Sequence, residues 1–365
     1  MGLFKKLFRS EEESEITTYA DFWKWFALHH RSFHQMVSSM DRATIEEQFF
    51  RQIAPRLHDL NHGIFYLTGM LGDSIAELVL TADGNPKSVV YVEELVDAAP
   101  ELDGWRFTKL KQPSPGIGVH MHGQIFDAET LSFYPNESES LPDLIDITLV
   151  HAAFDGDDDN GLKNGAFIFL ENLIGELNLL TIVDQVQFAT PAGAEKEIIP
   201  IDALPNFLET RQSLFAEKHD GVRIFTENDS YSLLEATLEN GNKLLATVNT
   251  DLLRWERKAS HPWMLVVTVK YDPEELMGLP TSQTGEKLEE IEDFITQSLK
   301  DADGYLNIGR QSANGERNIF FACVDFREPS KVLDRTIEKF PEWSISYDIF
   351  KDKYWESVEM FNPER

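Results

Sequence analysis

The sequence predicts an α+β protein of two domains, and three features support this class. The chain has 365 residues, too many for one ordinary hydrophobic core and suitable for two. Its hydrophobic share of 42% and charged share of 26% are typical of globular domains. Hydrophobic residues recur with helical spacing in some segments and with strand spacing in others, in both halves of the chain.

The first half predicts a flexible tail over residues 1–17 and an N-terminal α+β domain over residues 18–208. Its first expected helices cover residues 22–37 and 45–60, and the second is expected to break near Pro55, because proline disrupts helix interiors. From residue 63 the hydrophobic period becomes strand-like. The remaining expectations are a helix over 88–99, a helical or turn segment around 168–178, and strands near 63–70, 75–84, 105–111, 117–125, 129–134, 144–153 and 181–189. We therefore expect two helices plus a mixed or antiparallel sheet.

The second half predicts a linker over 209–222 and a C-terminal domain over 223–365. Two hairpins are expected over 231–249 and 305–326, because Asn240-Gly241 and Asn314-Gly315 are favoured pairs for tight turns. A strand over 263–272, helices carrying Leu288 to Leu299 and Val332 to Phe340, and a last strand over 343–350 complete the series. The order is βαββαβ after a leading β-hairpin, which is the ferredoxin-like arrangement.

Residues 225–361 contain a set of short motifs: Asn249, His261-Pro262-Trp263, Gly278-Leu279-Pro280, Glu292-Asp293, Gly309-Arg310, Gly315, Arg317 and Asp352 with Trp355. These motifs resemble those of the bacterial family catalogued as domain of unknown function 695. This resemblance implies a fold like that of the regulator of ribonuclease E activity B, an acidic α+β protein that binds and inhibits another protein. The N-terminal part is similar to uncharacterised bacterial proteins around residues 22–26, 81–84 and 92–96, which implies no activity.

Charge is the strongest compositional signal in the chain. Asp and Glu number 63 against 33 Lys and Arg, giving a net charge of −30. This field repels phosphate backbones, so we expect no nucleic-acid partner, and it attracts basic proteins. One cysteine and no long apolar run favour the cytoplasm without stable membrane association. The composition leaves the oligomeric state open.

Histidines are the candidate metal ligands. His30 with His34, and His58 with His62, are spaced four residues apart, which places two imidazoles on one helix face. His120 and His122 alternate along an expected strand and would share one face of it. No zincin motif accompanies either helical pair. We therefore expect structural histidines, no metal site and no cofactor.

An acidic run and several tryptophans are the candidate partner-binding residues. Asp155, Asp157, Asp158 and Asp159 lie close together, but their register does not match a calcium-binding loop. The aromatic arc of the first helix is wider than one packed face needs, because Trp23 and Trp25 lie on either side of it. Trp343 and Trp355 raise the same question near the C-terminus: aromatic residues are enriched in interfaces, yet they also pack cores.

The sequence therefore predicts a non-enzymatic acidic binding or inhibitory protein that engages a basic protein partner, as regulators and immunity proteins do. No recognised catalytic motif occurs. One alternative is a metal-dependent hydrolase that uses the N-terminal histidines. Another is a structural scaffold that self-associates through its tryptophan-rich faces.

Overall fold

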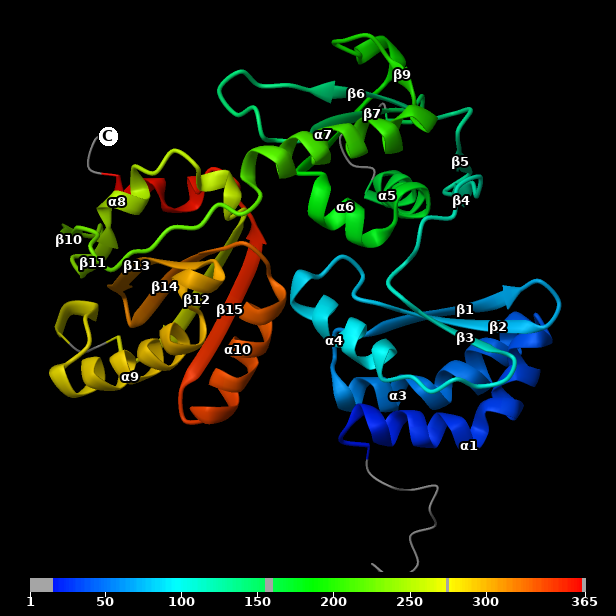
Figure 1. The fold of residues 1–365 in the computed structure, drawn as a ribbon, viewed down its shortest axis with the longest axis horizontal. Coiled ribbons are helices and arrows are strands. Elements are labelled where there is room, and N and C mark those ends of the chain that lie inside the picture. Colours follow the sequence, from blue (N-terminus) through cyan, green and yellow to red (C-terminus); the bar gives the residue numbers. More distant parts are fainter. Residues whose placement is uncertain (1–15, 155–159, 274–275, 363–365) are drawn as a thin grey trace, which may run out of the picture. The chain divides into compact units, whose positions relative to one another are not determined.

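The computed structural model describes residues 16–154, 160–273 and 276–362, and it is an α+β structure, as the sequence predicts (Figure 1). The chain separates into two compact units. The N-terminal unit comprises Met1–Ser132, Leu149–Thr181 and Phe188–Asp202. The C-terminal unit comprises Phe133–Thr148, Ile182–Gln187 and Ala203–Arg365.

Helices open the N-terminal unit. Helix α1 (Tyr19–Ser38) begins at Thr18, whose hydroxyl accepts the Asp21 N–H while Asp21 accepts the Thr18 N–H, a reciprocal cap. Three helical segments follow: α2 (Arg42–Thr44), the π-helical η3 (Ile45–Phe50) and α3 (Arg51–Leu60). The predicted break at Pro55 is wrong, because α3 continues through it. The carbonyl that Pro55 leaves without a donor belongs to the first residue of α3, directly after the wide π turn.

A mixed three-stranded sheet follows, in the order β1 (Phe65–Leu71), β2 (Ile75–Thr81), β3 (Trp105–Lys109). Strands β1 and β2 are antiparallel, and helix α4 (Pro86–Asp97) makes the crossover to the parallel strand β3. Helices α1, α3 and α4 lie on one face of this sheet (Figure 1). Ala76, Leu78 and Leu80 are fully buried on the alternate positions of β2, and the intervening positions lie on the other face.

Several shorter elements complete the first part of the chain. They are β4 (Val119–Met121) paired with β5 (Gln124–Phe126), the sheet β8-β7-β6-β9 made of β6 (Ser132–Asn136), β7 (Asp146–Val150), β8 (Gln185–Ala189) and β9 (Ile199–Pro200), helices α5 (Asn160–Ile174) and α6 (Glu176–Ile182), and the 3-10 turns η4 (Pro191–Gly193) and η5 (Ile201–Ala203). Among the described residues no single helix is long and apolar enough to cross a membrane, and only α5 with α6, bent by 103°, reaches that length and composition jointly.

Residues 204–219 form helix α7 (Leu204–His219), although the sequence predicts a linker over 209–222. Leu204 and Leu208 are buried one helical turn apart, and proline stands at the helix start, where its missing N–H costs nothing. The helix therefore has a short buried apolar anchor and a longer, mostly exposed remainder, which explains why its hydrophobic period is weak in the sequence.

The C-terminal unit has the predicted ferredoxin-like order after a leading hairpin. Its elements are β10 (Tyr231–Thr237), β11 (Lys243–Asn249), α8 (Thr250–Leu253), η6 (Lys258–Ser260), β12 (Trp263–Lys270), η7 (Leu276–Gly278), α9 (Ser282–Ser298), η8 (Asp301–Asp303), β13 (Tyr305–Ala313), β14 (Glu316–Cys323), α10 (Arg327–Lys339), β15 (Ser344–Lys351) and η9 (Glu356–Phe361). The sheet order is β10-β11-β13-β14-β12-β15, all antiparallel. Strand β14 thus separates β12 from β13, as a split βαβ unit requires.

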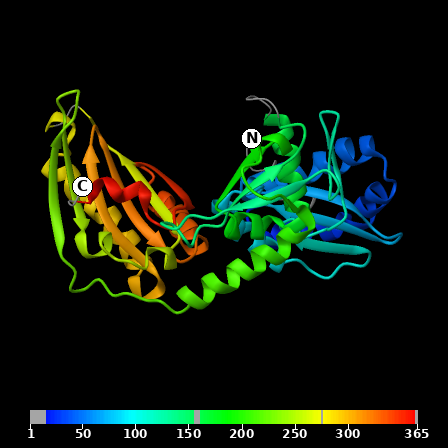
Figure 2. The ribbon, with the colours of Figure 1, turned by 90° about the horizontal axis from the view of Figure 1, so that it is seen from above.

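Both faces of this six-stranded sheet are covered. Helices α9 and α10 lie together on one face (Figure 1). On the other face, Trp355, Val358 and Phe361 from the C-terminal segment, drawn red in Figure 2, join a core with Phe320 and Leu252. The sheet therefore has a hydrophobic core on each face.

Candidate functional site

An acidic hollow lies over helices α9 and α10 of the C-terminal unit. It has a volume of about 420 Å³. Its lining residues are Glu286, Glu289, Glu290, Asp293, Phe294, Gln297 and Lys339. The four carboxylates are exposed and belong to one helix, and the lining contains one ammonium group, that of Lys339. The hollow therefore carries a local excess of negative charge.

A lysine of the chain itself occupies part of this hollow. Lys339 Nζ lies 3.8 Å from the centroid of the Phe294 ring and 5.3 Å from that of Phe340. Aromatic ring faces attract cations at this range. The arrangement is a cation above a ring with carboxylates around it, which is the geometry that a lysine or arginine of another protein would need.

Nearby basic residues balance part of the acidic helix. Lys287 Nζ lies 2.9 Å from Glu290 Oε2 and lowers the pKa of that carboxyl, through a hydrogen bond first and through charge second. Arg310 Nη2 lies 3.5 Å from Glu289 Oε1. Glu286 and Asp293 lie on the same exposed face. All four acidic side chains are thus accessible from solvent.

The sequence contains a signal for this hollow in the spacing of its acidic residues. Glu286, Glu289, Glu290 and Asp293 have the spacing i, i+3, i+4, i+7, which places four side chains on one helix face. The core stripe of α9, which includes Leu288, Ile291 and Ile295, is fully buried on the opposite side. The acidic stripe was therefore predictable once the core stripe was assigned.

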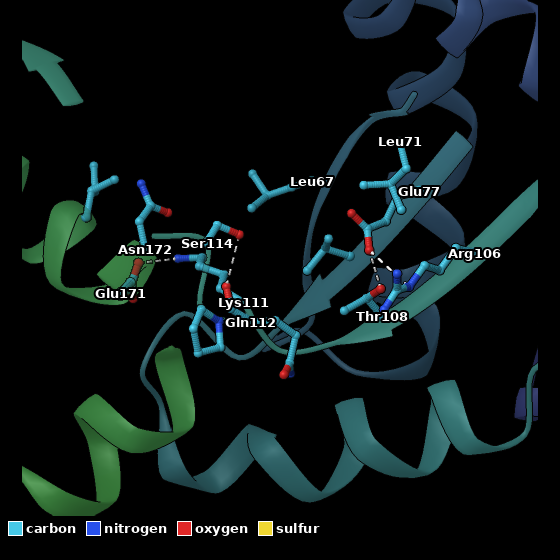
Figure 3. Close-up of a pocket in the computed structure, with 13 residues that line it drawn as sticks. Leu67, Leu71, Glu77, Arg106, Thr108, Lys111, Gln112, Ser114, Glu171 and Asn172 are labelled. Atoms are coloured by element: carbon cyan, nitrogen blue, oxygen red, sulfur yellow. Dashed lines mark hydrogen bonds and ion pairs between the residues drawn. The ribbon is translucent and has the colours of Figure 1, made fainter. Parts of the chain in front are cut away.

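A second hollow lies in the N-terminal unit, on the face of the three-stranded sheet that α1, α3 and α4 do not cover. Figure 3 shows its lining. Its volume is about 440 Å³. Apolar side chains come from Leu67 and Leu71 of β1, Val79 of β2 and Ile168 of α5. Polar side chains come from β2, β3, the segment after β3, and α5: Glu77, Arg106, Thr108, Lys111, Gln112, Ser114, Glu171 and Asn172.

Two separate charged groups border this pocket (Figure 3). At one end Glu77 accepts a short hydrogen bond from the Thr108 hydroxyl, and Arg106 Nε lies 3.7 Å from Glu77 Oε1. At the other end Lys111 Nζ donates to Asp83 and to Glu171, each at 2.9 Å. Burial raises the pKa of Glu171. Burial alone would lower the pKa of Lys111, but the carboxylates of Asp83 and Glu171 outweigh that effect and raise it.

Glu176 positions the backbone beneath the Lys111 group. Its carboxylate is 2% exposed and accepts hydrogen bonds from the Thr81 hydroxyl at 2.6 Å and from the backbone N–H groups of Gly84 and Lys111 at 3.1 and 3.0 Å. Buried carboxylates persist only when they are satisfied in this way. Glu176 therefore holds the start of α6 against the strand ends, and Lys111 is positioned by its backbone as well as its side chain.

Three of the four predicted tryptophans are buried. Trp23 is 2% exposed, and its indole N–H donates to the Leu95 carbonyl at 2.6 Å. Trp25 is 5% exposed, and Arg56 Cζ lies 4.1 Å from the centroid of its ring. Trp355 is fully buried and donates to the His261 carbonyl at 3.0 Å. The wide aromatic arc of α1 is explained by neighbours on both sides, and the burial of these three side chains favours the packing alternative over partner contact.

The other predicted partner residues have different positions. Trp343 is half-buried, directly before β15. Asp155, Asp157, Asp158 and Asp159 lie outside the residues that the structure describes.

The candidate histidines do not converge in the N-terminal unit. His30 and His34 bond to different backbone carbonyls, those of Ala27 and Ser74. His58 and His62 meet each other, with Nδ1 atoms 2.8 Å apart, and both are exposed. His120 is exposed, and His122 packs against the backbone of Gly161. Over residues 16–154, 160–273 and 276–362, no group of three or more His, Cys, Asp or Glu could hold a metal ion.

The C-terminal unit also contains a buried charged cluster. Lys353 Nζ donates to Asp184 Oδ2 at 2.6 Å and to the Asp143 carbonyl at 2.8 Å. Burial lowers the pKa of the neighbouring Lys351 to about 8, although Asp184 opposes that shift. Asp146 has a raised pKa because of burial and because of Asp184. These groups join residues 143–146 and 183–184 to the end of β15, which is a structural role.

Comparison with known proteins identifies one region of the chain. No curated protein and no solved structure gives a significant match. All the motif residues quoted for the C-terminal half lie within the range that a family model covers. Residues 236–361 match the family of unknown function DUF695, which confirms the predicted resemblance for this region.

Proposed function

We propose that this chain is a non-enzymatic binding protein that engages a basic protein partner through the acidic hollow on α9 and α10. The observation that carries the proposal is Lys339, which lies above the Phe294 ring among four carboxylates. A lysine or arginine of the partner would occupy the same kind of position beside it. The chain's net charge of −30 would accelerate the approach of such a partner.

The fold supports the same reading. The βαββαβ order with a leading hairpin is the arrangement expected from the resemblance to the regulator of ribonuclease E activity B, which binds and inhibits another protein. Here the helical layer of this unit carries the acidic hollow. We propose the cytoplasm as the location, in keeping with a single buried cysteine. Fold likeness alone does not identify a partner. The proposal of a basic partner therefore depends on the carboxylates and the aromatic ring of the hollow.

The test compares two variants of the full chain that remove the same number of charges. The first replaces Glu286, Glu289, Glu290 and Asp293 by Gln or Asn. The matched control replaces four exposed acidic residues of the N-terminal unit: Glu47, Asp59, Asp73 and Glu101. Each protein is immobilised and exposed to cell lysate at low salt and at about 1 M salt, where surface electrostatics are screened within about 3 Å.

We expect the unmodified chain and the control to retain the same basic protein at low salt, and the hollow variant to lose it. Loss of the partner by both variants to the same extent would mean that net charge alone attracts it. Retention by the hollow variant would remove the hollow from the mechanism.

A further inference from the structure

The pairing of β1 with β2 gives the pocket in the N-terminal unit an apolar floor. Leu67 of β1 is paired with Val79 of β2, and Gly69 is paired with Glu77. Space above Gly69 is open, since a Cβ there would meet nothing within 4 Å. Ile168 of α5 lines the pocket from outside the sheet. A ligand body can therefore lie across the strands without displacing a side chain of β1 at this position.

Two opposite charges lie side by side at one end of this floor. Glu77 and Arg106 are register partners on the parallel strands β2 and β3, with Arg106 Nε 3.7 Å from Glu77 Oε1. The Thr108 hydroxyl donates to the same Oε1, which fixes the carboxylate. The side chain of Glu77 is 21% exposed and that of Arg106 is 64% exposed. Both groups can exchange water for a ligand.

The closeness of these two charges selects the ligand class. A ligand with a single charge gains from one of the two groups and is opposed by the other at nearly the same distance, so its net electrostatic gain is small. A zwitterion gains from both. In an α-amino acid the ammonium nitrogen and the carboxyl carbon are about 2.5 Å apart, which follows from standard backbone bond lengths and angles, and this suits two adjacent opposite charges.

The opposite end of the pocket does not compete for the ligand's carboxylate. Lys111 already donates to Asp83 and Glu171 at 2.9 Å, and its side chain is 17% exposed. An incoming anion would have to displace two carboxylates from it. The Lys111 ammonium is therefore already paired and does not bind the ligand. The Glu77–Arg106 pair provides the polar contacts of the pocket.

We infer that this pocket binds a free α-amino acid with a large apolar side chain. Arg106 binds its carboxylate, Glu77 binds its ammonium group, and its side chain lies over Leu67 and Val79 towards Ile168. The volume of about 440 Å³ is within the range of small-molecule pockets and exceeds what a small side chain would fill. This binding is independent of the proposed protein partner, which engages a different unit of the chain.

Calorimetric titration of the full chain tests the inference. The probes are L-phenylalanine and L-leucine, with three analogues that each lack one element: 3-phenylpropionate lacks the ammonium group, phenethylamine lacks the carboxylate, and glycine lacks the side chain. We expect saturable binding of phenylalanine or leucine with one site per chain. Each analogue should bind about tenfold or more weakly, because each loses a charge-assisted contact or the apolar contact.

Two substitutions assign the polar contacts. Arg106→Met and Glu77→Gln should each weaken phenylalanine binding about tenfold or more. Arg42→Met and Glu46→Gln are matched controls, because they break an ion pair on the exposed helical segment after α1 and should leave binding unchanged. Circular dichroism of every variant shows whether the fold persists, and Thr108→Val offers a second way to release Glu77 with little change in shape.

Three results would overturn the inference. One is that neither amino acid binds at millimolar concentration to the folded chain. Another is that 3-phenylpropionate or phenethylamine binds as tightly as phenylalanine, since a single charge would then suffice. The third is that Arg106→Met, folded as judged by its dichroism, binds phenylalanine with unchanged affinity.

Discussion

Lys353 and Asp184 form a buried ion pair, with Nζ 2.6 Å from Oδ2 and side chains that are 4% and 7% exposed. Asp184 also accepts the Ile145 N–H at 2.7 Å. Asp184→Asn would leave the Lys351 and Lys353 ammonium groups without their shared counter-charge. We expect it to lower the free energy of unfolding by about 3–5 kcal/mol, measured by urea titration.

The control for this prediction is an exposed ion pair. Lys109 Nζ lies 2.9 Å from Asp97 Oδ1, and their side chains are 46% and 64% exposed. Asp97→Asn should cost less than about 1 kcal/mol, because solvent screens both charges. Equal effects of the two substitutions would mean that Asp184 is not needed to compensate buried charge.

His261 should make the chain sensitive to acid. It is fully buried, and burial first, with Arg223 second, lowers its pKa from 6.5 to about 4. Between pH 6.5 and about 4, therefore, the His261 imidazole is protonated in the unfolded state and neutral in the folded state. The stabilisation is complete above pH 6.5 and is lost as the pH falls to about 4, for a total of about 3 kcal/mol.

Urea titrations across this pH range measure the effect. His261→Gln should flatten the decline in stability between pH 6.5 and pH 4, whereas His62→Gln, which changes an exposed residue, should not. A decline of the same slope in the His261 variant would assign the acid sensitivity to other groups.

The C-terminal fold was predictable because its turns are specified locally. Asn314 and Gly315 have φ angles of 51° and 80°, and Gly241 has 85°, values that few other residues adopt readily. Once these turns define the hairpins, the remaining hydrophobic periods leave one arrangement of helices and strands. Helix α7 escaped prediction because only a few of its residues, led by Leu204 and Leu208, are buried.

The candidate sites were less predictable, for two physical reasons. The pocket depends on the parallel pairing of β2 with β3, which brings Glu77 beside Arg106 across the α4 crossover. No local pattern specifies such a pairing. The tryptophans of α1 had the opposite problem: their pattern was visible, but burial on both sides of the helix depends on α3 and β3.

Cys323 should be chemically silent in the folded chain. It is the only cysteine, it is fully buried in β14, and burial raises the pKa of its thiol well above the ordinary value, with Asp325 adding to the shift. Thiolates react and thiols do not, so both accessibility and ionisation protect it. A chromogenic disulfide reagent at pH 8 should label the chain only after urea is added. Rapid stoichiometric labelling of the native chain would contradict this.

Gly309 should be irreplaceable at the bulge of β13. Its φ is 148°, and the register of β13 against β14 shifts between Asn307 and Gly309. A Cβ there would overlap the carbonyl oxygen of Thr247 and lie 2.8 Å from Val248 Cα, both in the backbone of the adjacent strand β11. That strand cannot retreat without breaking its hydrogen bonds to β13. We expect Gly309→Ala to lower the free energy of unfolding by about 3 kcal/mol or more.

Gly285 is the matched control, because the same substitution there should act in the opposite direction. It lies inside α9 at an ordinary helical φ, and a Cβ would meet nothing within 4 Å. Gly285→Ala removes backbone freedom from the unfolded chain and should raise the free energy of unfolding by about 0.5–1 kcal/mol. Urea titration of both variants measures the contrast, and a small effect of Gly309→Ala would mean that β11 yields at this crossing. The glycine in the Gly309-Arg310 motif is thus explained by strand packing, independently of any ligand.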